Sequence, residues 1–356
     1  MKKILAILLS LALVFAFVAC GGDSGSEEPA TDEATEETTE PAAEEQSFEL
    51  VLGGVTPDPA KDGETKFVEL IEEYSNGTVT CQDFPDNSLG DDLARLEMCI
   101  NGECDIAIGA SANYTSILND FYLFDIYFFF LNKQEVYDVG FAGEAAKVMQ
   151  DSAESAGVKV VSMWENGFRD LTTNNKEVHS PADLKGLKIR TMENEIHLAA
   201  WKALGANPTP MTFSEVFTAM QQGTIDGQEN PMALMVSNSF QEVEKFCVKT
   251  EHVYSPFIVV MNLELFNSMS EAQQEAVMTA MADTQKYHLD QCASFEEYAE
   301  GEFEKAGATV ITLTDEEKVA FQDAVAAADC ESMAKELMVH PEVVDNMKAE
   351  LEAYRG

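Results

Sequence analysis

Short apolar runs alternate with amphipathic segments from Ser47 onward, and this alternation limits the fold more than any other feature of the chain. Residues 48–52, 79–84 and 105–109 have the length and composition of buried strands. Between these runs, apolar residues recur at helical spacing, at Phe67, Leu70, Ile71 and Tyr74 and again at Leu89, Leu93, Leu96 and Ile100. Repeated strand-to-helix alternation predicts an α/β fold in which helices cover a parallel sheet.

The alternation continues in the second half of the chain. Residues 157–161 and 187–190 are further predicted strands. Helix starts are indicated where a Ser or Thr is followed three residues later by an acidic residue, as in a capping box, at Ser180, Thr212 and Thr314. The part of the chain that follows the N-terminal region has about 310 residues, which is enough for two domains.

One segment lacks helix-breaking residues over an unusual length. It starts at Ser270, a capping residue with Gln273 three positions on, and contains neither Gly nor Pro before Gly301. A helix of about thirty residues is roughly 45 Å long, which exceeds the size of one domain. We expect this helix to lie across two domains; the alternative is a break without a Gly or Pro signal.

The N-terminus has the pattern of an export signal. Two lysines precede the apolar residues 4–18, a run too short to span a membrane but of the proportions of a signal peptide. The run leads into Val-Ala-Cys-Gly, which resembles a bacterial lipobox around Cys20. We therefore expect a signal peptide over residues 1–19, and a lipid on Cys20 that anchors an extracytoplasmic protein to the cell membrane. The alternative is a plain secretory signal with an incidental cysteine.

The segment after Cys20 is strongly acidic. Residues 21–46 contain ten acidic residues, no basic residue and no large apolar one. Such a segment cannot bury enough apolar surface to offset its ordering entropy. We therefore expect residues 20–46 to be a disordered tether.

Charge and motif content exclude several classes of function. The formal net charge of −42 disfavours nucleic-acid binding, because phosphate backbones repel so acidic a protein. The sequence contains no recognisable catalytic motif in a predicted folded segment, and its five histidines have no metal-ligand spacing. We expect no enzyme activity, no cofactor and no metal. Besides Cys20 there are six cysteines, which either form disulfides or remain buried thiols: Cys81, Cys99, Cys104, Cys247, Cys292 and Cys330.

Arg190 is the candidate anion-binding residue. It lies at the end of the predicted strand 187–190 and shortly before a predicted helix that runs to Leu204. A guanidinium group can hold a carboxylate with two hydrogen bonds, and a helix N-terminus adds oriented amides. In open α/β sheets, ligands bind at the carboxyl ends of strands. The alternative is a surface salt bridge.

Three segments resemble the substrate-binding proteins of TRAP transporters, the DctP/SiaP-type family: residues 180–190 (SPADLKGLKIR), 204–217 (LGANPTPMTFSEVF) and 226–231 (DGQENP). The similarity extends from about residue 48 to residue 300. It implies a two-lobed, periplasmic-binding-protein-like (Venus-flytrap) fold with hinge strands, a long domain-spanning helix and a ligand cleft between the lobes. It also implies two membrane subunits as partners, one small and one large, that use an ion gradient.

The resemblance also implies domain boundaries. The expected lobe I comprises residues 47–166 and 256–295. The expected lobe II comprises residues 167–255 and 296–356.

The resemblance implies ligand contacts as well. Arg190 matches the principal carboxylate-binding arginine of the family and Arg169 a second basic residue near the ligand, while Phe213 and Asn230 match further contact positions. On the other lobe, cleft-lining positions are matched by Val55, Ala110 and Ser111.

The chain departs from the sialic-acid members of the family. Those members have polar groups at the positions of Val55 and Ala110, and Asn at the position of Glu193. We therefore expect the ligand to be a small monocarboxylate. One such ligand is an amino acid whose ammonium group lies near Glu193; the alternative is that Glu193 caps the following helix. Two further functions remain open, a C4-dicarboxylate-specific binding protein and a lipoprotein that presents its ligand to a sensor.

Overall fold

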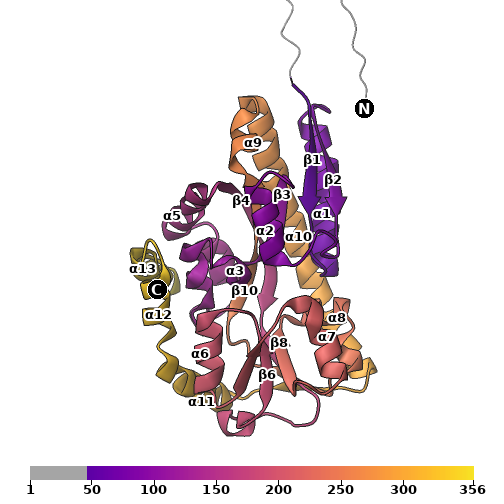
Figure 1. The fold of residues 1–356 in the computed structure, drawn as a ribbon. Coiled ribbons are helices and arrows are strands. Elements are labelled where there is room, and N and C mark those ends of the chain that lie inside the picture. Colours follow the sequence, from indigo (N-terminus) through magenta and orange to yellow (C-terminus); the bar gives the residue numbers. More distant parts are fainter. Residues whose placement is uncertain (1–45) are drawn as a thin grey trace, which may run out of the picture. The chain divides into compact units, whose positions relative to one another are not determined.

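The structure, a computed structural model, describes residues 46–356. The expected signal peptide, Cys20 and nearly all of the expected tether lie outside the described residues. Two sheets organise the described part (Figure 1). Sheet A has the strand order β2 (Val79–Phe84), β1 (Phe48–Gly53), β3 (Ile106–Ala110), β10 (Tyr254–Asn262) and β4 (Val158–Phe168). Sheet B has the order β11 (Thr309–Thr312), β9 (Phe246–Lys249), β5 (Asp170–Thr173), β8 (Gly227–Asn230), β6 (Lys188–Thr191) and β7 (Asn207–Pro210).

Helices surround both sheets. The α-helices of the described part are α1 (Asp58–Tyr74), α2 (Asp92–Ile100), α3 (Ser111–Tyr114), α4 (Lys133–Glu135), α5 (Glu144–Ser152), α6 (Glu195–Ala203), α7 (Phe213–Gln221), α8 (Met232–Ser237), α9 (Leu263–Ser268), α10 (Glu271–Lys305), α11 (Asp315–Val325), α12 (Cys330–Leu337) and α13 (Glu342–Arg355). Within residues 46–356, no helix has both the length and the apolar composition needed to cross a membrane. The α/β class and the two sheets confirm the predicted two-lobed α/β fold.

The sheets are mixed, whereas the alternation predicted parallel ones. In sheet A, β10 is antiparallel to both β3 and β4. Strand β4 leads into β5 of sheet B, and β10 returns from sheet B to sheet A after β9. β4 and β10 carry the chain between the two sheets in opposite directions, and they pair antiparallel (Figure 1). A simple alternation of strands and helices does not predict such a pair.

Helix α10 is the long helix that the sequence indicates. Its N-terminus has the expected capping box between Ser270 and Gln273. The helix continues through Gly301 to Lys305, because a glycine costs only about 1 kcal/mol within a helix and buried side chains anchor this turn on both sides. It ends before Gly307, whose φ of 83° lies in the left-handed region that terminates helices.

Other boundaries differ by a few residues. Helix α2 begins at Asp92, so Leu89 lies in the preceding loop. The predicted capping box at Thr212 is absent, because the Thr212 hydroxyl donates to the Glu215 carboxylate instead of accepting a backbone N–H. The capping boxes at Ser180 and Thr314 are present as predicted.

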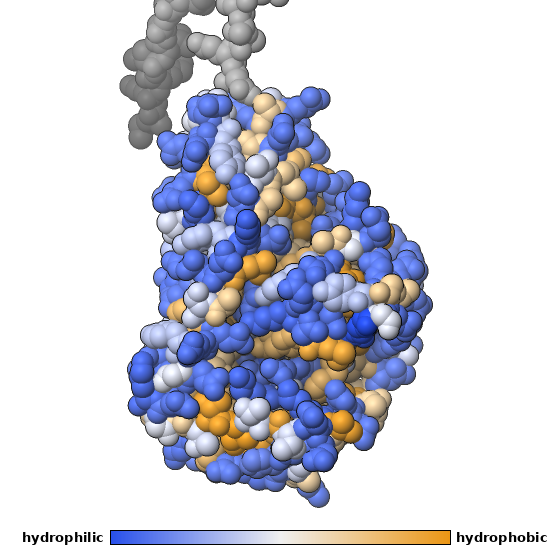
Figure 2. All heavy atoms as spheres, turned by 180° about the vertical axis from the view of Figure 1, so that it is seen from behind, coloured by the Kyte–Doolittle hydropathy of each residue, from blue (hydrophilic) through white to orange (hydrophobic). Residues whose placement is uncertain are grey.

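The core is apolar on both faces of sheet A. Helices α1 and α10 cover one face, with Phe67, Ile71 and Val277 fully buried. The face of the molecule shown in Figure 2 is largely hydrophilic, with apolar residues in separate patches, as the acidic composition leads one to expect. The six cysteines in the described part are all free thiols, which answers the question left open by their spacing.

Candidate functional site

A cleft cavity is lined by residues from both sheets and from the loops between them. The residues predicted to contact a ligand are largely brought together here: Val55, Ala110, Arg169, Arg190, Phe213 and Asn230 all line this cavity. Arg190 and Asn230 lie at the carboxyl ends of the neighbouring parallel strands β6 and β8, which is where α/β sheets place their ligands. Glu193 and Ser111 do not line it.

Arg190 is a buried cation inside the cleft. Its side chain is 2 % exposed, and its Nε and Nη2 both donate to the Met211 carbonyl oxygen, at 3.1 and 2.7 Å. Burial lowers the pKa of Arg190 to about 10, and the nearby Arg169 acts in the same direction, so the group remains protonated at neutral pH. In the part of the chain that the structure describes, Arg190 makes no ion pair, and its Nη1 makes no hydrogen bond.

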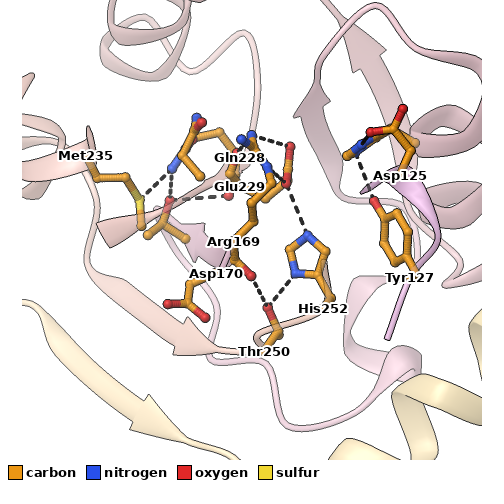
Figure 3. A network of polar contacts seen from close by, with 12 residues as sticks. Asp125, Tyr127, Arg169, Asp170, Gln228, Glu229, Met235, Thr250 and His252 are labelled. Atoms are coloured by element: carbon orange, nitrogen blue, oxygen red, sulfur yellow. Dashed lines mark hydrogen bonds and ion pairs between the residues drawn. The ribbon is translucent and has the colours of Figure 1, made fainter. Parts of the chain in front are cut away.

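Arg169 has the opposite situation, because it is already neutralised. Its Nε and Nη2 donate to the two carboxylate oxygens of Glu229, at 2.5 and 2.9 Å, and both side chains are almost completely buried. The ring of His252 lies between Glu229 and Thr250, with Nε2 3.1 Å from Glu229 Oε2 and Nδ1 2.8 Å from the Thr250 hydroxyl (Figure 3). The Arg169 side chain thus borders the cleft as one half of an ion pair.

The electrostatics of this network follow from burial and contact. Burial alone would raise the pKa of Glu229, but the Arg169 charge and the bonds from His252 and Arg169 hold the pKa well below its ordinary value. Burial lowers the pKa of His252, against the effect of Glu229. Arg190 is therefore the uncompensated positive charge of the cleft lining.

Two of the amides at the start of the helix after Arg190 are already bonded within the chain. Helix α6 begins at Glu195, and the side-chain oxygen of Asn194 accepts the Ile196 and His197 N–H groups, at 3.0 and 3.2 Å. These two amides are therefore not available to a ligand, and the expected contribution of the helix end to anion binding stays a prediction. The alternative that Glu193 caps the helix is wrong, because Asn194 is the cap.

Glu193 lies in a second cavity next to the cleft, which we call the annex. Arg190 and Phe213 line both cavities, so the two are neighbours. The annex has a volume of about 180 Å³, and four carboxylates line it, those of Asp91, Asp92, Glu193 and Glu195. Arg190 is its one lining cation among the residues that the structure describes.

The side of the cleft formed by sheet A is held by buried polar contacts. The Val55 N–H donates to Oε1 of Glu64 at 2.8 Å, and Glu64 is fully buried. Burial raises the pKa of Glu64 to about 8, and Asp83 adds to this effect. Ser111 is fully buried at the start of α3, and its hydroxyl has no hydrogen-bond partner in the described part, but it lies outside the cavity lining.

Sequence reasoning missed nine residues of the cleft lining, among them the polar residues Asn166 and Asp92. Asn166 lines the cleft, is 7 % exposed, and neither atom of its amide group has a partner among the described residues. Asp92 lines the cleft too; it pairs with the buried Arg95 at 2.5 Å and accepts the Ala110 N–H at 3.0 Å. The sequence does contain a signal for Asp92: it lies three residues before Arg95 on one helix, and Arg95 falls on the apolar face, where it needs a partner.

The cleft is narrow. Its cavity has a volume of about 30 Å³, which accommodates about one water molecule, whereas sites for small organic ligands have roughly 300–1,000 Å³. A ligand with several carbon atoms can therefore enter only if the walls of the cleft move apart.

Two mixed sheets with a cleft between them are the architecture of a solute-binding protein. The chain matches the DctP family, described as bacterial extracellular solute-binding protein, family 7, over residues 56–336. It belongs to this family and is a TRAP transporter solute-binding protein, as the resemblance implied. Proteins of this kind bind small organic acids and work with TRAP membrane subunits.

Individual relatives show which ligands similar chains bind. The 2,3-diketo-L-gulonate-binding periplasmic protein YiaO of Escherichia coli is 34 % identical over 80 % of this chain and 85 % of its own length. The sugar acid binding protein DctPAm of Advenella mimigardefordensis, solved with galactonate, has a TM-score of 0.81 and 28 % identity, over 86 % of this chain and 99 % of that one. A TRAP solute-binding protein of Sulfurospirillum deleyianum, solved with succinate, has a TM-score of 0.78 and 26 % identity, over 86 % and 99 %.

Proposed function

We propose that this protein binds a small monocarboxylate in the cleft, with the carboxylate on Arg190, and delivers it to the membrane subunits of a TRAP transporter. One observation carries the proposal: Arg190 is a buried guanidinium without an ion pair in the described part of the chain. A buried charge is costly unless it is paired, and a carboxylate matches the guanidinium geometry with charge-assisted hydrogen bonds.

The proposed ligand has no second negative charge. Four carboxylates line the annex next to Arg190, and they would repel a second anionic group. The hydroxyl groups of a sugar acid can donate to these carboxylates, and the ammonium group of an amino acid can pair with Glu193. The ligands of the Escherichia coli and Advenella relatives support the hydroxylated form. The apolar Val55 and Ala110 support a ligand other than sialic acid.

Isothermal titration calorimetry with galactonate, glutamine and succinate tests the proposal. We expect one of the two monocarboxylates to bind at least tenfold more tightly than succinate. Arg190→Ala should weaken its binding by about 2–5 kcal/mol, since the carboxylate loses its buried partner, and Arg190→Lys should restore only part of that loss.

Arg355→Ala is the matched control, because it removes the same charge at the C-terminal end, where Arg355 pairs with Glu135. Unchanged affinity in Arg190→Ala would refute the carboxylate site. Tight succinate binding together with weak binding of both monocarboxylates would favour the C4-dicarboxylate alternative, which the Sulfurospirillum neighbour supports.

The proposal includes attachment to the membrane through a lipid on Cys20. The acidic segment of residues 21–46 would connect this anchor to the binding domain. Cell fractionation tests it: the wild-type protein should sediment with membranes, and Cys20→Ala should appear in the soluble fraction. A wild-type protein that is released without lipid would contradict the anchor.

A ligand-presenting sensor is the second candidate, because the same binding cleft would serve it. Solute uptake in cells separates the two functions. Deletion of the gene should abolish uptake of the ligand if the protein serves transport, and leave uptake intact if it serves only a sensor.

A further inference from the structure

A third cavity lies at the junction between β4 and β5, and we call it the junction cavity. It has a volume of about 340 Å³. Its walls come from the β4–β5 connection, the start of α8, the second half of α10 and the loops around Lys133 and Glu251. It shares only Asn166 with the lining of the cleft, so it is a separate site.

Negative charge exceeds positive charge around this cavity. Five carboxylates line it, those of Glu165, Asp170, Glu251, Glu296 and Glu300. Lys133 pairs with both Glu165 and Glu296, each at 2.8 Å, Lys249 pairs with Glu300 at 3.0 Å, and Lys318 pairs with Glu251. Three lysines thus neutralise part of the charge of five carboxylates, and an excess of two negative charges remains when Asp170 is ionised.

Asp170 is the carboxylate without a cation. It is 6 % exposed, its Oδ1 accepts the Glu251 N–H at 3.0 Å, and it makes no ion pair within residues 46–356. Burial raises the pKa of Asp170 to about 7, as expected for a carboxylate without a counter-charge. The amide of Asn166 adds a buried oxygen and nitrogen that have no partner among the described residues.

We propose that the junction cavity binds a small aliphatic diamine, with one ammonium group on Asp170 and the Asn166 amide oxygen, and the other beside Glu296 and Glu300 on α10. A dication matches the excess of two negative charges, and an ammonium group donates the hydrogen bonds that these oxygens accept. Glu296 and Glu300 lie one helical turn apart and line a cavity wide enough for a four-carbon chain.

The lining favours an amine over a metal ion. Phe168, Pro231 and Met232 supply apolar surface for methylene groups, whereas Ca²⁺ and Mg²⁺ need a compact shell of six or more oxygens. In the described part of the chain, no group of three or more His, Cys, Asp or Glu side chains is arranged to hold a metal.

Isothermal titration calorimetry of the purified protein with 1,4-diaminobutane, at constant pH and about 0.15 M salt, tests the proposal. We expect saturable binding of one diamine per chain and at least tenfold weaker binding of n-butylammonium, which carries a single charge. Asp170→Asn should weaken diamine binding at least tenfold, and Glu300→Gln, a change at a half-exposed side chain that leaves the core intact, should weaken it as well.

Two controls separate this site from the cleft and from general charge effects. Glu275→Gln removes an exposed carboxylate elsewhere on α10 and should leave diamine affinity unchanged. Arg190→Ala should strongly weaken organic-acid binding but leave diamine binding unchanged, so failure of the proposed function and failure of this site are distinguishable.

Three outcomes would overturn the proposal. The first is the absence of diamine binding to the folded wild-type protein. The second is equal diamine affinity in wild type, Asp170→Asn and Glu300→Gln. The third is binding of CaCl₂ that depends on Asp170 while the diamine does not bind.

Discussion

Arg169 and Arg190 are both buried at the cleft, but they differ in their partners. Arg169 pairs with Glu229 through two nitrogens, whereas Arg190 donates only to the carbonyl oxygen of Met211. The sequence pattern predicted Arg190 as the anion-binding residue, because a strand end followed by a helix start is visible in the chain. The neutralisation of Arg169 was not predictable, because Glu229 lies sixty residues away and is brought close only by sheet pairing.

The Arg169–Glu229 pair predicts a large stability effect. Glu229→Gln should destabilise the protein by about 3–5 kcal/mol at neutral pH, because it leaves a buried guanidinium unpaired. Since the pKa of Glu229 is lowered in the folded state, its contribution is present above about pH 4 and is lost as the pH falls below that. Urea unfolding at pH 7 and under acidic conditions measures both effects. The exposed Glu215→Gln is the control, and an equal acid dependence in wild type and Glu229→Gln would contradict the assignment.

Asp170 predicts the opposite pH dependence. Its pKa is raised to about 7, so the folded state retains a proton that the unfolded state loses near pH 4, and stability falls as the pH rises between these values. Asp170→Asn should gain stability relative to wild type over this range, by up to about 4 kcal/mol for the full shift. Thermal unfolding from pH 4 to pH 8 without added amines measures it. A constant difference between the two proteins across this range would show that Asp170 does not titrate as described.

At the scale of elements, helix periodicity was the reliable signal. The apolar face around Phe67 and Ile71 predicted α1, and the absence of Gly and Pro after Ser270 predicted α10. Strands β7 and β8 were not predicted, because Asn207–Pro210 and Gly227–Asn230 have no apolar alternation and form strands only by pairing, β7 with β6 and β8 with both β5 and β6. The expected lobe boundaries stay a prediction.

Asn194 shows how one helix cap also joins two parts of the chain. Besides capping α6, its amide nitrogen donates to Asp125 Oδ2 at 2.7 Å and to the Thr115 hydroxyl at 3.2 Å. Asn194→Ala should therefore cost about 2–4 kcal/mol, from the lost cap and from a buried Asp125 without this donor. The control is Thr314→Ala at the exposed cap of α11, which should cost only about 1 kcal/mol. Chemical denaturation compares them, and equal losses would contradict the second role of Asn194.

At the scale of the whole described part, few polar bonds hold the rim of the cleft together. Ser214 Oγ lies 3.2 Å from Asp91 Oδ2, the Asp58 N–H donates to Ser237 Oγ at 3.0 Å, and Asn238 donates to Thr56 at 3.0 Å. Hydrogen bonds of this kind contribute only about 0.5–1.5 kcal/mol each. These three bonds therefore oppose separation of the cleft walls, which the narrow cavity requires for ligand entry, only weakly, and a ligand that contacts both walls favours closure.

Spin labels on two exposed positions, Glu97 of α2 and Gln221 of α7, report this movement. Double electron–electron resonance should show a broad distance distribution for the free protein, and a shorter, narrower one when the organic acid is bound. At the same ligand concentration, labels in Arg190→Ala should keep the broad distribution. A narrow distribution in the free protein that does not change on binding would contradict ligand-driven closure.

Helix α10 packs along α1 and β4 and then reaches α8 and β11, so one continuous helix is fixed to both sheets. Any displacement of one sheet relative to the other must bend this helix or slide it along its supports. The backbone hydrogen bonds of a 35-residue helix resist twisting and shortening far more than gentle curvature. Relative movement of the two sheets is therefore coupled to the curvature or the sliding of this one helix.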